Sequence, residues 1–165
     1  MMKLFCGVWV LFLVFGKSWG QGTANSQYPY QLLPGNNKYA AVVIGESTWH
    51  RARTACETDL PGATLFNVDN DADSAWLGER INIEKDRFSG SSKFWVGLVS
   101  ESGPSSRRWL SGSPYIHHKE VVQADGDEDA EKIYAWAVPD SFTRLKYEFL
   151  TQTDLGDSFI CEYKA

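Results

Sequence analysis

The chain has 165 residues, which suffices for one domain with a hydrophobic core and is too short for two ordinary domains. Apolar residues make up 43% of the chain and charged residues 22%, so the composition argues against a disordered protein. With a formal net charge of -5, the chain lacks the basic surface that neutralises phosphate groups, and neither nucleic acid nor anionic lipid is an expected partner.

The first twenty residues have the pattern of a secretory signal peptide. Lys3 gives a positive start, and residues 4–15 form an almost entirely apolar run that is shorter than the roughly 20 residues of a membrane-spanning helix. Ser18 and Gly20 are small residues at the positions that a signal peptidase reads. We therefore predict that residues 1–20 are removed and that the protein is secreted to the extracellular space. A buried N-terminal helix is the alternative.

The cysteine count predicts one disulfide bond. Cys6 leaves with the signal peptide, so the mature chain retains Cys56 and Cys161. Two cysteines in a secreted domain are expected to pair, because that environment is oxidising. Two free or intermolecular thiols are the alternative.

Residues 21–37 are polar, contain two prolines, and predict a flexible lead-in to the domain. Two helices are then expected. The first follows a cap at Ser47 or Thr48 and ends before Pro61, and its buried face is formed by residues spaced i, i+3 and i+7: Trp49, Ala52 and Cys56. The second follows three aspartates whose charges favour a helix N-terminus: Asp69, Asp71 and Asp73.

Short strands are predicted before, between and mainly after these helices. They are expected near residues 39–44, 63–66, 94–98, 109–112, 147–150 and 158–163. Two early helices followed by short strands predict an α+β fold with loops over one end.

Five motifs stand in a characteristic order along residues 38–165. They are Trp49-x-x-Ala52-x-x-x-Cys56, Gly62-Ala63-Thr64-Leu65, Trp95-Val96-Gly97-Leu98, Trp109 with Gly112, and Phe159-Ile160-Cys161-Glu162. Their order and spacing resemble those of the C-type lectin-like domain family. The resemblance implies two helices flanking short antiparallel sheets, a long-loop region that carries the ligand site, and a disulfide from the first helix to the last strand.

The motif residues are expected to be structural before they are functional. We predict that the large apolar ones fill the core and that Gly97 lets two backbones approach. These core residues are Trp49, Trp95, Leu98 and Trp109. Contact with a ligand is the alternative for each of them.

The resemblance also implies a sugar site that works through calcium, which takes about six to eight oxygen ligands. The family's Glu-Pro-Asn or Gln-Pro-Asp triplet reads Val138-Pro139-Asp140 here, and valine supplies no side-chain oxygen. Lys146 stands near a further acidic position of the family, and the family's inner cysteine pair is absent. The remaining candidates for sugar and calcium binding are Pro139, Asp140, Glu148 and Asp154.

An acidic stretch at residues 125–131 is a second candidate ion-binding loop, since a cation would relieve the repulsion between its carboxylates. Its acidic residues are Asp125, Asp127, Glu128, Asp129 and Glu131. A solvated surface is the alternative. This stretch and the one that begins at Asp69 both lack the glycine and glutamate of an EF-hand.

The sequence favours a binding protein over an enzyme. It contains no G-x-S-x-G, H-E-x-x-H or phosphate-binding loop motif, and both mature cysteines are expected in a disulfide. Two functions stay open. One is carbohydrate binding with Ca²⁺ as cofactor. The other is a lectin-like domain without a sugar site that binds extracellular protein or a mineral surface, which the negative charge would suit.

Overall fold

The computed structural model describes residues 26–35, 37–84, 93–101, 106–115, 121–122, 134–141 and 144–165. The predicted signal peptide and the acidic stretch at 125–131 lie outside these residues. The elements are β1 (Gln31–Leu32), β2 (Lys38–Ser47), α1 (Trp49–Asp59), β3 (Thr64–Leu65), α2 (Asp71–Glu84), β4 (Phe94–Ser100), β5 (Arg107–Trp109), β6 (Val121–Val122), β7 (Tyr134–Ser141), β8 (Arg144–Leu150) and β9 (Gly156–Lys164). This content confirms the predicted α+β class.

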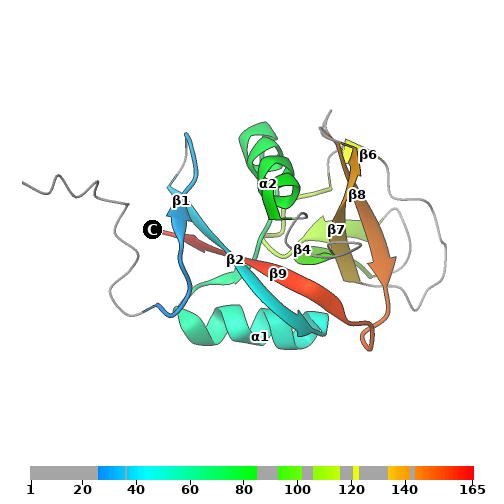
Figure 1. The fold of residues 1–165 in the computed structure, drawn as a ribbon, viewed down its shortest axis with the longest axis horizontal. Coiled ribbons are helices and arrows are strands. Elements are labelled where there is room, and N and C mark those ends of the chain that lie inside the picture. The colour runs from blue at the N-terminus through cyan, green and yellow to red at the C-terminus, as the bar shows by residue number, and fades with distance from the viewer. Residues whose placement is uncertain are drawn as a thin grey trace, which may run out of the picture.

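One sheet connects all the described strands. Its order is β1-β2-β9-β4-β7-β8-β6, and β3 and β5 add to β9 and β4. The first long strand, β2, pairs antiparallel with the last, β9, from Lys38 opposite Lys164 to Ser47 opposite Gly156. The β4–β9 and β6–β8 pairs are parallel, whereas the family resemblance implied antiparallel sheets. Figure 1 shows α1 and α2 on opposite sides of the paired strands β2 and β9.

Helix α1 begins and turns as its sequence predicts. The Thr48 side chain accepts a hydrogen bond from the backbone N–H of Arg51 and so caps the helix. The three residues at the predicted spacing are buried: Trp49, Ala52 and Cys56. Gly62 follows with a φ of 85°, a conformation that glycine adopts without strain and that reverses the chain after the helix.

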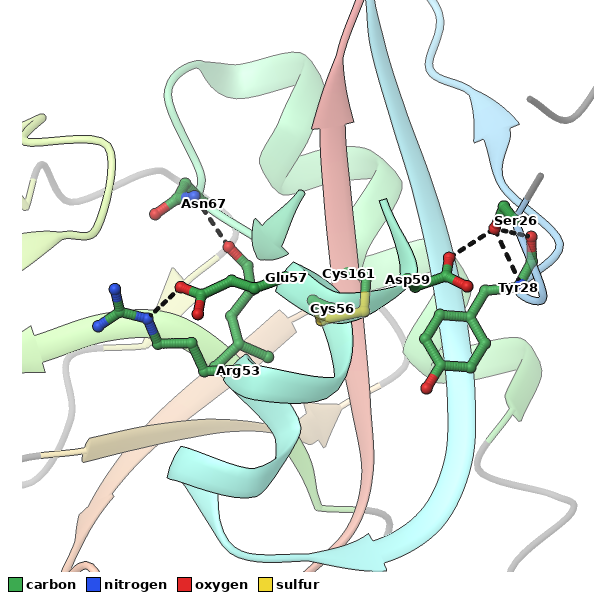
Figure 2. Close-up of a disulfide and its surroundings, with 9 residues drawn as sticks. Ser26, Tyr28, Arg53, Cys56, Glu57, Asp59, Asn67 and Cys161 are labelled. Atoms are coloured by element: carbon green, nitrogen blue, oxygen red, sulfur yellow. Dashed lines mark hydrogen bonds and ion pairs between the residues drawn. A yellow bond between two sulfur atoms is a disulfide. The ribbon is translucent and has the colours of Figure 1, made fainter. Parts of the chain in front are cut away.

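Cys56 and Cys161 form the predicted disulfide, which joins α1 to β9 (Figure 2). The two residues are separated by 105 positions in the sequence, and both are fully buried. Because α1 lies early in the domain and β9 ends it, this bond ties the two ends of the domain together.

Each face of the sheet carries a core. On the α2 side, the core includes Trp76, Leu77 and Ile81 of the helix. On the α1 side, it includes the disulfide and the helix residues Trp49 and Ala52. All four large core residues predicted from the motifs are at most 2% exposed: Trp49, Trp95, Leu98 and Trp109.

Gly97 allows a close approach, as predicted. A Cβ atom at this position would lie 2.7 Å from Oδ1 of Asn67 and 2.9 Å from the carbonyl oxygen of Leu65. The Gly97 N–H donates to the carbonyl of Phe66 at 2.8 Å. The segment after β3 therefore packs directly on the β4 backbone.

The second half of the predicted flexible lead-in is packed against the domain, which corrects that expectation for residues 26–35. Gln31 and Leu32 of β1 pair with β2, and Tyr30 and Leu33 are 4% and 2% exposed. The physical reason is burial of these two apolar side chains, one in each core, within an otherwise polar stretch. Within the described chain, neither helix is long and apolar enough to cross a bilayer.

Candidate functional site

The residues predicted to bind sugar and calcium lie along the β7–β8 hairpin and the turn after it. The triplet that ends in Asp140 lies inside β7, where Val138 pairs with Lys146 and Pro139 with Leu145. It is therefore part of a strand, although the resemblance led us to expect it in the long-loop region. Glu148 lies further along β8, opposite Trp136.

Asp140 and Asp154 lie at opposite ends of β8. Asp140 immediately precedes the tip of the hairpin, and Asp154 lies in the turn beyond Leu150. At about 3.3 Å a residue, the strand from Leu145 to Leu150 separates the two ends by roughly 17 Å. Calcium holds its oxygen ligands at about 2.3–2.6 Å, so these two residues do not bind one ion together.

Asp154 and Glu148 have local contacts instead. Oδ2 of Asp154 accepts hydrogen bonds from the backbone N–H of Thr151 at 2.8 Å and from its hydroxyl at 2.9 Å, which closes the turn between β8 and β9. Oε1 of Glu148 lies 3.7 Å from the ammonium of Lys146. The residues present therefore do not fit the family's calcium arrangement at the positions predicted from the sequence.

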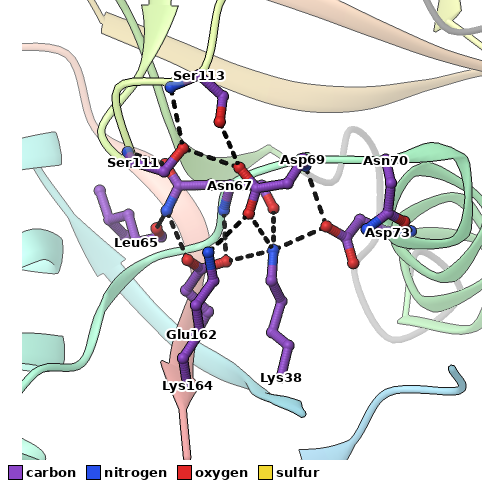
Figure 3. A network of polar contacts seen from close by, with 10 residues as sticks. All are labelled: Lys38, Leu65, Asn67, Asp69, Asn70, Asp73, Ser111, Ser113, Glu162 and Lys164. Atoms are coloured by element: carbon purple, nitrogen blue, oxygen red, sulfur yellow. Dashed lines mark hydrogen bonds and ion pairs between the residues drawn. The ribbon is translucent and has the colours of Figure 1, made fainter. Parts of the chain in front are cut away.

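The densest convergence of charges in the described chain was not predicted. It lies on the α2 side of the sheet, where β2, β9 and the segment before α2 meet (Figure 3). The ammonium of Lys38 is at its centre, and this side chain is 3% exposed. Its Nζ lies within 2.7–3.0 Å of four oxygens, which belong to the carbonyl of Asn67 and the carboxylates of Asp69, Asp73 and Glu162.

Asp69 links this polar cluster to the turn after β5. Its Oδ1 accepts from the hydroxyls of Ser111 at 2.8 Å and Ser113 at 3.0 Å, while its Oδ2 accepts from Lys38 and Lys164. Burial by itself would raise the pKa of Asp69, but the hydrogen bonds from Lys164, Lys38 and Ser111 outweigh it and hold the pKa well below its ordinary value. Asp69 therefore stays ionised.

Glu162 is the last residue of the predicted motif, and its pKa is shifted in the opposite direction to that of Asp69. Its carboxylate accepts from the backbone N–H and the side-chain amide of Asn67, both at 2.8 Å, and lies 3.0 Å from Lys38. Burial raises the pKa of Glu162, and the charge of Lys38 and the Asn67 hydrogen bonds offset this only in part. The cluster thus holds a buried carboxylate in place through a single lysine and an amide.

A cavity of about 290 Å³ lies beside the polar cluster and is lined by Asn37, Lys38, Asp69, Asn70, Lys164 and Ala165. Asp69 is fixed at its edge by the contacts described above. Over the described part of the chain, no group of three or more His, Cys, Asp or Glu residues is arranged to hold a metal ion. The Lys38 ammonium occupies the position between the carboxylates of the polar cluster. The cluster therefore stabilises the fold.

Sequence reasoning missed this cluster because its partners are far apart in the chain. Lys38 and Glu162 are brought together by the pairing of β2 with β9, and Asp73 comes from the first turn of α2. The sequence pattern explained Asp69, Asp71 and Asp73 only as charges that favour a helix N-terminus. The one available signal was Glu162 in the last motif. A carboxylate that is buried in a strand needs a cation nearby.

Comparison with known proteins places the chain in a structural family. Residues 45–162 match the family model described as Lectin C-type domain. The fold is similar to the C-type lectin CEL-I from Cucumaria echinata, with 15% identity, a TM-score of 0.62, and coverage of 87% of this chain and 97% of that one. It is also similar to human lithostathine, with 18% identity, a TM-score of 0.61, and coverage of 79% and 94%.

A third similar structure is the C-type lectin domain of murine dendritic cell inhibitory receptor 2, which was solved in complex with N-glycan. It is 16% identical to this chain, with a TM-score of 0.56 and coverage of 78% of this chain and 92% of that one. Identities this low establish a shared fold and no shared ligand. Comparison with curated protein sequences gave no match.

Proposed function

The chain belongs to the C-type lectin domain family, and from this premise we propose that it is a secreted carbohydrate-binding protein that does not hold calcium through Asp140, Glu148 and Asp154. Binding, and not catalysis, is the proposed activity. The fold supports the carbohydrate part, because a domain with the same architecture was solved with N-glycan. The apolar run at residues 4–15 supports the secreted part.

The observation that carries the calcium part of the proposal is the β7–β8 register. Pro139 pairs with Leu145 at one end of β8, while Tyr134 pairs with Leu150 at the other. This register puts Asp140 and Asp154 too far apart for one ion. A sugar bound to this domain would then be held by hydrogen bonds and ring contacts from protein side chains alone.

The test is a glycan array probed with the full-length chain, expressed with its own leader and collected from the medium. Binding is measured with added calcium and again with EDTA, and calcium itself is titrated by calorimetry. We expect glycan binding that persists in EDTA and is unchanged by Asp140→Ala or Asp154→Asn. Glycan binding abolished by EDTA and by Asp140→Ala would show that the calcium mode operates and that the proposal is wrong.

The thermal midpoint of each variant serves as a control for folding, since Asp154 also closes a turn. A chain that folds but gives no glycan signal in either buffer would contradict carbohydrate binding. That result would leave the second function that the sequence allowed, recognition of an extracellular protein or mineral surface. Retention of the chain within cells would contradict secretion.

A further inference from the structure

The cavity beside the polar cluster is closed by buried residues on one side and reached from solvent on the other. Lys38, which is 3% exposed, lines its inner part, whereas Asn37, Asn70 and Lys164 are exposed. Its volume of about 290 Å³ lies at the lower end of the range of roughly 300–1,000 Å³ for small-molecule sites. A ligand the size of one sugar ring therefore has both room and a path to the polar groups of this cavity.

Two asparagine side chains bring unused hydrogen-bonding groups to the cavity. Oδ1 of Asn70 caps α2 by accepting from the backbone N–H of Asp73 at 3.0 Å, while its Nδ2 donates to no described residue. The side chain of Asn37 likewise makes no hydrogen bond with the described chain. An amide offers both donors and an acceptor, which is the combination that a hydroxyl group requires.

Lys164 supplies a charged donor that is only partly used. It lies opposite Lys38 in the β2–β9 pair, and both ammonium groups lie 3.0 Å from Oδ2 of Asp69 (Figure 3). Lys38 is surrounded by four oxygens, whereas Lys164 has this single polar contact among the residues that the structure describes. An ammonium has three N–H donors, so two of those on Lys164 are available to a ligand.

These groups are positioned before any ligand arrives. Asn70 is held by its cap on α2, and Lys164 is held by its ion pair with Asp69. The backbone carbonyl of Asn37 accepts from the N–H of Ala165 at 3.1 Å, which joins the two chain segments on either side of the cavity. A ligand that binds here pays little to order the site.

The charges around the cavity disfavour both a cation and an anion. A cation would meet the ammonium groups of Lys38 and Lys164, and an anion would meet the carboxylate of Asp69, which is 20% exposed. Asp69 stays ionised, since its pKa lies well below its ordinary value. A neutral ligand with several hydroxyl groups avoids both repulsions, and the methylene stems of the two lysines offer apolar surface to its C–H groups.

We propose that this cavity binds one neutral sugar ring, held by the side chains of Asn37, Asn70 and Lys164 without a metal ion. The site rests on the proposed function, because it names the place where the sugar binds. Figure 1 shows the end of β9 on the opposite side of the molecule from β7 and β8, which carry most of the candidates predicted from the family resemblance. The proposed site is therefore separate from those candidates.

The experiment follows the side-chain amide signals of the ¹⁵N-labelled full-length chain, secreted from yeast, by NMR with EDTA present throughout. Glucose, galactose, mannose and N-acetylglucosamine are titrated in separate series, and then the amino and uronic-acid counterparts of the first three. We expect a saturable shift of the Asn37 and Asn70 signals with at least one neutral sugar, and weaker binding of its charged counterparts. The Asn67 amide is the internal reference, because it already donates to Leu65 and Glu162.

The variants separate this site from general effects of charge. Asn70→Asp keeps an oxygen to cap α2 but removes the amide donors, and Lys164→Met removes the ammonium but keeps most of the stem. Each should weaken sugar binding about fivefold or more. Lys146→Met is the matched control, because it removes an ammonium that also lies near a carboxylate, that of Glu148 at 3.7 Å, and it should leave binding unchanged.

Asn37→Ala keeps the test decisive if another variant fails to fold. The Asn37 side chain is exposed and makes no hydrogen bond with the described chain, so its loss should weaken sugar binding while leaving the thermal midpoint unchanged. A folded Asn37→Ala that binds sugar as tightly as the unaltered chain would contradict the role of this amide.

The outcomes distinguish this site from the proposed function. If no sugar shifts the Asn37 and Asn70 signals, or if Lys164→Met binds as tightly as Lys146→Met, while the glycan array shows binding, the cavity is not the sugar site and carbohydrate binding stands. If the array shows no binding either, both proposals are wrong. Tighter binding of an amino sugar or a uronic acid at these signals would contradict a neutral ligand.

Discussion

The ammonium of Lys38 lies 2.8 Å from the carboxylate of Asp73, and the two side chains are 3% and 0% exposed. Lys38 is the first residue of β2, and Asp73 is in the first turn of α2. Each ion was removed from water to form this pair, so each depends on the other for its solvation. Glu162, 3.0 Å from the same ammonium, depends on it as well.

Replacing Lys38 with methionine should destabilise the domain strongly. The side chain would keep most of its volume, but Asp73 and Glu162 would remain buried without their cation, a situation that costs about 3–5 kcal/mol. Urea unfolding followed by tryptophan fluorescence measures the change. The matched control is Arg53→Met, which breaks an exposed pair with Glu57 and should cost about 0.5 kcal/mol or less. Similar losses in both variants would contradict the central role of Lys38.

Asp69 should make the stability of the domain depend on pH in the acid range. Its pKa is lower in the folded state than its ordinary value of 3.8, so it binds a proton less readily folded than unfolded. Its contribution is therefore fully present above the unfolded-state pKa and is lost as pH falls below that value toward the folded-state pKa.

The measurement compares the free energy of unfolding of the unaltered chain with that of Asp69→Asn across the acid range. The difference should be constant above about pH 5 and should shrink as the pH falls below about 4. Asp154→Asn is the control, because it also removes an aspartate that accepts local hydrogen bonds, but one outside the polar cluster. A difference that grows toward low pH would have the wrong sign for this explanation.

Gly97 should tolerate no side chain. A Cβ there would press on Oδ1 of Asn67 at 2.7 Å and on the Leu65 carbonyl at 2.9 Å, and the second of these is backbone that has little freedom to move. Gly97→Ala is expected to cost about 1–3 kcal/mol, as overpacking does in other cores. Gly45→Ala is the control, since a Cβ at Gly45 would meet nothing within 4 Å. The measurement is the thermal midpoint of each variant. Equal midpoints for Gly97→Ala and Gly45→Ala would contradict the tight contact at Gly97.

The features that the sequence predicted correctly are those set by local rules or by counting. A cap at Ser47 or Thr48 and the i, i+3, i+7 spacing located α1, because both depend on residues within one or two turns, and the structure has Thr48 as the cap. The disulfide between Cys56 and Cys161 was expected because these are the two cysteines outside the predicted signal peptide. The lead-in was predicted as flexible because residues 21–37 are polar on average, and average polarity hides the burial of Tyr30 and Leu33.

The candidate site was harder to predict because it depends on pairing between distant segments. The positions of Asp140 and Asp154 follow from the register of β7 with β8, which sequence spacing alone does not determine. The ion-pair partners of Lys38 come from distant parts of the chain, namely α2, β9 and the segment before α2. A lone lysine just before a predicted strand carries no sign that it will be buried among carboxylates.

Asp59 holds the N-terminal segment onto the end of α1. One carboxylate oxygen accepts from the Ser26 hydroxyl at 2.5 Å (Figure 2). The other accepts from the backbone N–H of Gln27 at 2.8 Å. An acidic residue is unfavourable at a helix C-terminus, where the helix dipole is negative, and α1 has no basic residue in its last turn. These two hydrogen bonds offset that cost.

Asp59→Ala should therefore release the start of the chain while leaving the domain folded. The backbone N–H groups of residues 27–33 are expected to exchange with deuterium faster than in the unaltered chain, as mass spectrometry of peptic fragments would measure. Global stability should change by less than about 1 kcal/mol, because removing the charge from the helix end compensates for part of the lost contacts. Glu57→Ala removes a nearby carboxylate that pairs with Arg53 and should leave this exchange unaltered. Unchanged exchange in Asp59→Ala would mean that burial of Tyr30 holds the segment without help from Asp59.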